Sequence, residues 1–204
     1  MCTPVGTAPS RLDAWALCEA VAHRTPSLTT AARAFEWAGG APVVWLVAAA
    51  VGVVLAWRAR AVASLVAAMM ATVAAGAATL ALKQMVGRPR PPARQALVDA
   101  GGWSMPSTAA ALLAAPSVVL AVLLVRRLRG AARWASVAAV VTLDLALGAA
   151  LVYLGAHWAS DVLAGWAVGG AIGAVAAAAA ALLERARAPR ARGRSNDPVE
   201  ASRG

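Results

Sequence analysis

The chain has 204 residues, of which 61% are hydrophobic and 14% are charged. An ordinary soluble domain is about 45–50% apolar and about 25% charged, so this composition excludes one and indicates a membrane protein. The formal net charge of +10 does not indicate nucleic-acid binding, because the arginines flank apolar segments instead of lining one face of a soluble fold.

The first 40 residues are too polar to cross a bilayer. Charged groups at the bilayer centre cost at least ~2.5–3.5 kcal/mol each, and residues 11–38 contain several ionisable side chains: Asp13, Glu19, His23, Arg24, Arg33 and Glu36. The apolar residues between them fit helices lying in the membrane interface, broken at Thr25-Pro26. Residues 1–40 are therefore predicted to be an N-terminal interfacial segment, either a packing strut or a lid over a site.

Five long apolar blocks follow, at 41–57, 61–82, 107–125, 134–154 and 162–183. A bilayer-spanning helix needs about 20 apolar residues, so each block is a candidate span and residues 41–183 form one membrane domain. The predicted fold class is all-α: a polytopic membrane helix bundle of about five transmembrane helices, preceded by the N-terminal interfacial helical segment.

Two of these blocks contain residues that indicate a contact with another helix. Asp144 lies near the middle of the fourth block, where a carboxyl group needs a hydrogen bond inside the bundle; Thr72 and Thr79 are candidate partners, and a polar element beneath a site is the alternative. The last block contains Gly165, Gly169 and Gly173 at four-residue spacing. Such a stripe lets helices approach closely, either within one chain or at a homodimer seam.

The basic residues predict the orientation of the bundle. With five spans, twelve arginines share one side of the membrane and the other side carries seven basic residues. The arginine-rich side should be cytoplasmic, so the loops 83–106 and 155–161 should face outward from the plasma membrane. Residues 184–204 are rich in Arg, Pro, Gly and Ser and too poor in apolar groups to fold, which predicts a disordered basic cytoplasmic tail.

Three segments on the predicted outer side carry groups suited to an anion. Lys83 offers a point charge and Arg90 a planar fork of donors that matches phosphate oxygens. Ser107, after Pro106, is a candidate N-cap, and the free N–H groups of a first helical turn attract anions. His157 and Asp161 follow in the third segment, where the carboxylate could bond one ring nitrogen and leave the other as a nucleophile. Each feature alone is an ordinary flanking charge, cap or interfacial aromatic residue, but together they predict a phosphate site.

Over residues 12–182 the chain resembles the integral-membrane type 2 phosphatidic acid phosphatases, which share their core with vanadium haloperoxidases. The family's first motif is Lys, six residues, then Arg-Pro; its second is Pro-Ser-Gly-His, with Thr tolerated third; its third is Ser-Arg, five residues, His, three residues, Asp. The matching positions are Lys83, Arg90 and Pro91, then Pro106, Ser107 and Thr108, then His157 and Asp161.

The resemblance implies a mechanism without a metal or other cofactor. His157 would be the nucleophile that forms a phosphohistidine, and Asp161 would orient and stabilise it. The phosphate would be cradled by Lys83, Arg90, Ser107 and the backbone of Thr108. The substrate would be a lipid phosphate or diphosphate at the outer leaflet, such as an isoprenyl carrier, phosphatidic acid or phosphatidylglycerol phosphate.

Three positions depart from the family pattern. Ala109 stands where the family has its general-acid histidine, while Ala150 and Leu151 stand where it has Ser-Arg, whose arginine clamps the phosphate. Loss of a general acid typically costs 10²–10⁴-fold in rate, and loss of a charge-stabilising donor about 10²–10³-fold. The sequence therefore predicts either a phosphatase with weak activity or a catalytically inactive binder, carrier or partner subunit for a lipid phosphate. A replacement acid near position 109 would favour the phosphatase.

Overall fold

The computed structural model describes residues 8–40 and 62–187. These residues are mostly helical and contain no strand, which confirms the predicted all-α fold class. The helices are α1 (Arg11–Ala22), α2 (Pro26–Gly40), α4 (Val62–Val86), α5 (Thr108–Arg127), α6 (Gly130–Tyr153) and α7 (Ala159–Arg187), with a short 3-10 helix, η1 (Ala93–Gln95), between α4 and α5.

Four of the described helices, α4 to α7, are long and apolar enough to cross a membrane. They confirm the four predicted spans from residue 61 onward, and the predicted span at 41–57 lies outside the described residues. Helix α7 continues to Arg187, beyond its predicted end at 183. The added residues are Glu, Arg, Ala and Arg, which are all strong helix formers, so the helix extends past the apolar block.

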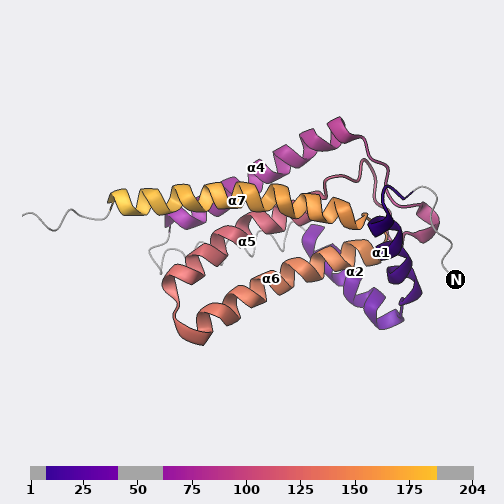
Figure 1. Ribbon diagram of the computed structural model, residues 1–204, viewed down its shortest axis with the longest axis horizontal. Helices are drawn as coiled ribbons and strands as arrows, with labels where there is room; N and C mark the ends of the chain where they lie inside the picture. The colour runs from indigo at the N-terminus through magenta and orange to yellow at the C-terminus, as the bar shows by residue number, and fades with distance from the viewer. Residues whose placement is uncertain (1–7, 41–61, 188–204) are drawn as a thin grey trace, which may run out of the picture.

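Helix α5 occupies the centre of the bundle (Figure 1). It packs most extensively against α7, while α4 contacts both of these helices and α6 lies against α5 on the other side. The glycines of α7 make the closest of these contacts. A Cβ atom added at Gly165, Gly169 or Gly173 would overlap a backbone carbonyl oxygen of α5, those of Ser107, Ala111 and Ala115 in turn. The stripe therefore serves packing within one chain, and the homodimer interpretation is not supported because α5 already occupies this face.

The N-terminal segment packs on the end of the bundle where α6 ends and α7 begins (Figure 1). It forms two helices broken at residues 23–25, as predicted. Leu17 is buried against Trp158, and Arg24 Nη2 donates to the backbone oxygens of Gln95 and Tyr153 at 2.7 and 2.8 Å. These contacts support the strut interpretation. Its position in the membrane interface stays a prediction, consistent with the exposed rings of Trp15 and Trp37.

The candidate partners of Asp144, Thr72 and Thr79, do not bond to it. Their hydroxyls donate to carbonyl oxygens of their own helix, those of Ala68 and Gly76, and the side chain nearest to the Asp144 carboxyl is Ser117 of α5. Threonine in a helix can satisfy its hydroxyl in this local way, so it does not need a partner across the bundle.

We expect the α5–α7 contact to tolerate no added methyl group. Gly169→Ala places a Cβ against the backbone of Ala111 and should lower the melting temperature in detergent, because overpacking costs ~1–3 kcal/mol. Gly170→Ala is the matched control, since nothing lies within 4 Å of its added Cβ and alanine is the better helix former. Equal melting temperatures for the two variants would contradict this assignment of the glycine stripe.

The orientation is tested by labelling with a membrane-impermeant thiol reagent, in a variant whose two natural cysteines are replaced by serine. Ala93→Cys lies at an exposed position of η1 and should be labelled in intact cells. Ser195→Cys, in the tail, should be labelled only after permeabilisation, because the arginine-rich side is expected to be cytoplasmic. The reverse pattern would overturn the predicted topology.

Candidate active site

A cavity of about 240 Å³ opens at the end of the bundle where α4 ends and α5 begins. It is bounded by the C-terminal part of α6, by the loop that leads to α7 and by α2. The residues that line it are Glu36, Lys83, Arg90, Ala100, Thr108, Ala109, Leu147, Leu151, Ala156 and His157. Four of the six predicted site residues thus face one space. The other two, Ser107 and Asp161, lie directly behind its wall.

His157 is held by a tight loop between α6 and α7. The backbone N–H groups of Ala156 and His157 both donate to the carbonyl oxygen of Leu151, at 3.0 and 3.3 Å. Gly155 has a φ of +70°, and a Cβ there would overlap the carbonyl oxygen of Gln95. Only glycine fits this turn without strain, so the sequence around Gly155 fixes where the imidazole points.

The contacts of His157 define which of its ring nitrogens carries the proton. Its Nε2 lies 3.2 Å from Arg90 Nη1, and Nδ1 lies 3.5 Å from Asp161 Oδ2. A guanidinium group has donors only, so Nε2 is the unprotonated acceptor and Nδ1 carries the hydrogen, on the side of the carboxylate, although at 3.5 Å it makes no hydrogen bond there. The electron pair of Nε2 therefore lies on the side of Arg90, which lines the cavity, and it is the pair that a nucleophile would use.

Burial lowers the pKa of His157 below its ordinary value of 6.5. The carboxylate of Asp161 opposes this shift, and the positive charges of Arg90 and Lys83 add to it. The imidazole is thus kept neutral near physiological pH, and its Nε2 electron pair, which accepts from Arg90, is the one that a nucleophilic attack would use.

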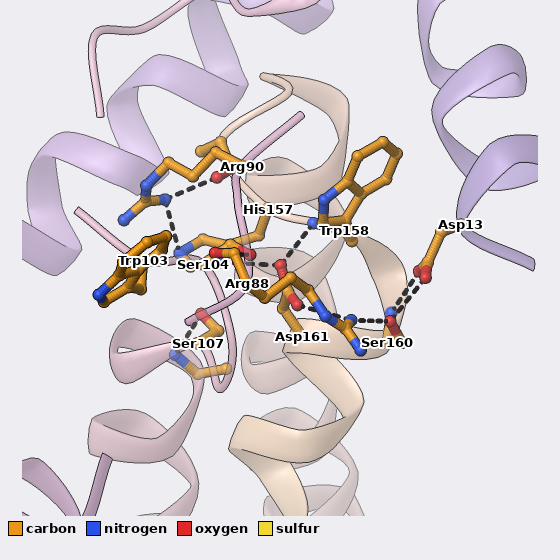
Figure 2. A network of polar contacts seen from close by, with 12 residues as sticks. Asp13, Arg88, Arg90, Trp103, Ser104, Ser107, His157, Trp158, Ser160 and Asp161 are labelled. Carbon is orange, nitrogen blue, oxygen red and sulfur yellow. Dashed lines mark hydrogen bonds and ion pairs between the residues drawn. The ribbon is translucent and has the colours of Figure 1, made fainter. Parts of the chain in front are cut away.

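Asp161 is completely buried, and its carboxylate accepts hydrogen bonds from a side chain and from the backbone (Figure 2). Its Oδ1 accepts from Arg88 Nη1 at 3.0 Å, and its Oδ2 accepts from the backbone N–H of Trp158 at 2.9 Å. Sequence reasoning assigned no role to Arg88, although it lies between Lys83 and Arg90 in the first motif. The structure shows that it is the cation that neutralises Asp161.

The N-terminal segment extends this network (Figure 2). Asp13 of α1 is fully buried and accepts from both the backbone N–H and the hydroxyl of Ser160, at 2.8 and 2.7 Å. Ser160 in turn receives a hydrogen bond from Arg88, at 2.7 Å. A buried carboxylate at the first turn of α7 is favourable because that turn has unpaired N–H groups. Sequence reasoning used Asp13 only to argue against a membrane span.

Lys83 and Arg90 are positioned by backbone carbonyl oxygens of the loop between α4 and α5. Lys83 Nζ donates to Trp103 at 2.6 Å and to Ser104 at 3.3 Å. Arg90 donates through Nε to Gly101 at 3.0 Å and through Nη1 to Ala156 at 2.6 Å. Its Nη2 makes no hydrogen bond with the described part of the chain. Each cation thus keeps N–H groups available for an anion in the cavity.

Ser107 and Thr108, at the N-terminus of α5, have different places relative to the cavity. Ser107 is the N-cap, as predicted: its Oγ accepts from the backbone N–H of Ala110 at 3.4 Å, and its own N–H donates to the carbonyl oxygen of Asp161 at 2.9 Å. It does not line the cavity. Thr108 does, and its buried hydroxyl has no hydrogen-bond partner, so the side chain as well as the backbone is available to a ligand.

The three residues that depart from the family motifs can also be placed relative to the cavity. Ala109 and Leu151 both line the cavity, so a histidine or arginine at these positions would point into it. Ala150 instead packs with Ala32 and Leu154, away from the cavity. The side of the cavity formed by α6 is therefore apolar, and its polar groups come from the other elements.

Glu36 of α2 was not expected at the site. It is half-buried and is the one carboxylate that the described residues contribute to the lining. Nothing local in the sequence indicates this, because its position depends on how α2 packs against α6. Among residues 8–40 and 62–187, no group of three or more His, Cys, Asp or Glu side chains could hold a metal ion.

Comparisons with known proteins agree with this arrangement. The family model of the PAP2 superfamily matches residues 61–184. The structure resembles the first transmembrane PAP2 type phosphatidylglycerolphosphate phosphatase from Bacillus subtilis, with a TM-score of 0.74, 22% identity and coverage of 86% of this chain and 87% of that one. It also resembles LpxE from Aquifex aeolicus, with a TM-score of 0.65, 20% identity and coverage of 83% and 96%. No curated protein matches the chain.

The protonation state of His157 can be measured by nitrogen-15 NMR of histidine-labelled protein in micelles, with His23→Gln so that a single histidine remains. We expect Nδ1 to be protonated and Nε2 unprotonated, with a pKa below 6.5 because the ring is buried. Arg90→Gln should raise that pKa, since it removes a neighbouring positive charge. A proton on Nε2 near neutral pH, or a pKa of His157 above 6.5, would contradict the assignment.

Proposed function

Because the chain belongs to the PAP2 superfamily, we propose that its cavity binds the phosphate group of a membrane lipid and that His157 attacks the phosphorus atom. One observation carries this proposal: the unprotonated Nε2 of His157 shares a cavity with Lys83 and Arg90, at one end of a membrane bundle. The site combines positive charge, a neutral nucleophile and an apolar wall, which suits a phosphate attached to a lipid.

Each group has a role in the proposed reaction. Lys83, Arg90 and the hydroxyl and backbone of Thr108 bind phosphate oxygens, and the free N–H groups at the start of α5 add to their field. Ser107 acts from behind the wall by capping α5 and fixing its position. Asp161 stabilises the positive charge that develops on the imidazole as Nε2 bonds to phosphorus, and Arg88 holds that carboxylate in place through an ion pair.

The substrate class is a lipid phosphate or diphosphate at the outer leaflet of the plasma membrane. Phosphatidylglycerol phosphate is one candidate, since a structurally similar protein is a phosphatidylglycerolphosphate phosphatase; phosphatidic acid and an isoprenyl carrier phosphate are others. The apolar side chains of Leu147, Leu151 and Ala100 line the same cavity and would contact the part of the lipid next to the phosphate.

The proposed rate is low, because the cavity has no histidine at position 109 and no arginine at position 151. The second candidate function is that of an inactive lipid-phosphate binder, favoured by the apolar side chains at positions 109 and 151. Phosphate release from several lipid phosphates by the purified protein in detergent separates the two. His157→Ala is the control, since it removes the proposed nucleophile and should abolish release.

We expect Ala109→His and Leu151→Arg each to raise the turnover number for lipid phosphate. The first returns an acid at a position lining the cavity and the second a phosphate clamp. A general acid contributes typically 10²–10⁴-fold, so a gain of at least about tenfold should be measurable. The combined variant should exceed either single one, because both groups act on the same transition state.

Two results would contradict this account. Turnover by the unaltered protein at rates common among enzymes, about 1–10³ s⁻¹, would show that nothing essential is missing. A combined variant that folds and binds lipid phosphate but remains inactive would favour the binder, since acid and clamp would then both be in place without effect.

A further inference from the structure

We propose that Glu36 is the proton donor to the leaving oxygen, taking the role that the family gives to a histidine at position 109. The inference rests on the function proposed above. It starts from the cavity itself, which contains the nucleophile and has one carboxyl group in its lining, that of Glu36, on an element outside all three motifs.

The packing of α2 directs Glu36 toward the cavity. Thr29 lies within hydrogen-bond distance of the Tyr153 hydroxyl, at 3.0 Å, and Ala32 is buried against Ala150 and Leu154. Residues 29, 32 and 36 lie on one face of a helix, because they are three and four residues apart. The contacts of the first two therefore hold the third facing α6, where Leu147 and Leu151 form the adjacent wall of the cavity.

The other acidic groups near the site already have hydrogen-bond partners. Asp161 bonds to Arg88 and to the backbone of Trp158, and Asp13 bonds to Ser160. Neither lines the cavity. Glu36 makes no hydrogen bond or ion pair with the described residues, so its oxygens are available to a substrate. Ala109, the position of the missing acid, lines the same space.

The reaction balances with Glu36 in this role. The electron pair on His157 Nε2 forms a bond to phosphorus, and the bond from phosphorus to the lipid oxygen breaks with its electron pair moving to that oxygen. The protonated carboxyl of Glu36 gives its proton to the oxygen, which leaves as an alcohol. Water then attacks phosphorus and gives a proton back to the Glu36 carboxylate, while the phosphorus–nitrogen electron pair returns to Nε2.

The test compares two substrates that differ in their need for an acid. The alkoxide leaving group of phosphatidic acid must be protonated, whereas the phenolate of para-nitrophenyl phosphate can leave without a proton. Glu36→Gln should therefore slow phosphate release from phosphatidic acid about 10²–10⁴-fold and change release from para-nitrophenyl phosphate less than tenfold. Glu19→Gln is the matched control: it makes the same change on the exposed face of α1, outside the cavity, and should affect neither substrate.

A second comparison supports or overturns the role independently of folding. Ala109→His should restore phosphatidic acid hydrolysis in the Glu36→Gln protein and should give a larger fold-gain there than in the unaltered protein. Glu36→Gln losses that are equal for the two substrates, or absent for both, would overturn the role of Glu36 while leaving the phosphatase function intact. If the unaltered protein binds orthovanadate but hydrolyses neither substrate, the hydrolytic function itself fails, and the role of Glu36 with it.

Discussion

The close contact between α5 and α7 is the constraint on which the rest of the structure depends. Three glycines of α7 lie directly against carbonyl oxygens of α5, which brings the first turns of the two helices together. At that end the backbone N–H of Ser107 donates to the carbonyl oxygen of Asp161. The N-terminus of α5 and the carboxylate behind His157 are thus set by packing deep in the bundle, not by the loops. Any side chain in the stripe would separate the two halves of the site.

The two buried carboxylates of the site, Asp13 and Asp161, both have hydrogen-bond partners. Asp161 is neutralised by Arg88, and Asp13 accepts two hydrogen bonds at the start of α7. A buried carboxylate without such partners would be strongly unfavourable. Because these pairs lie behind His157, the two cations that face the cavity remain unpaired by carboxylates and available to a phosphate. The N-terminal helices are therefore part of the site, since one supplies Asp13 and the other Glu36.

Much of this architecture follows from the sequence, for identifiable reasons. The spans from residue 61 onward are long apolar blocks, and motif spacing is enough to bring Lys83, Arg90, Thr108 and His157 to one cavity. The partner of Asp144 and the roles of Asp13 and Arg88 are not predictable in this way, because they depend on which helices touch. Glu36 is the clearest case. Residues 11–38 show only that α2 is polar, and its placement over the cavity depends on Ala32 packing against α6.

Position 151, where the family has an arginine, lies close enough to Glu36 for a charge there to act on its carboxylate. Both positions line one cavity, so an arginine there would attract the Glu36 carboxylate. With Leu151 in that place, the carboxyl group has an apolar neighbour. The cavity therefore combines the proposed acid from α2 with the apolar side chains that α6 contributes, Leu147 and Leu151.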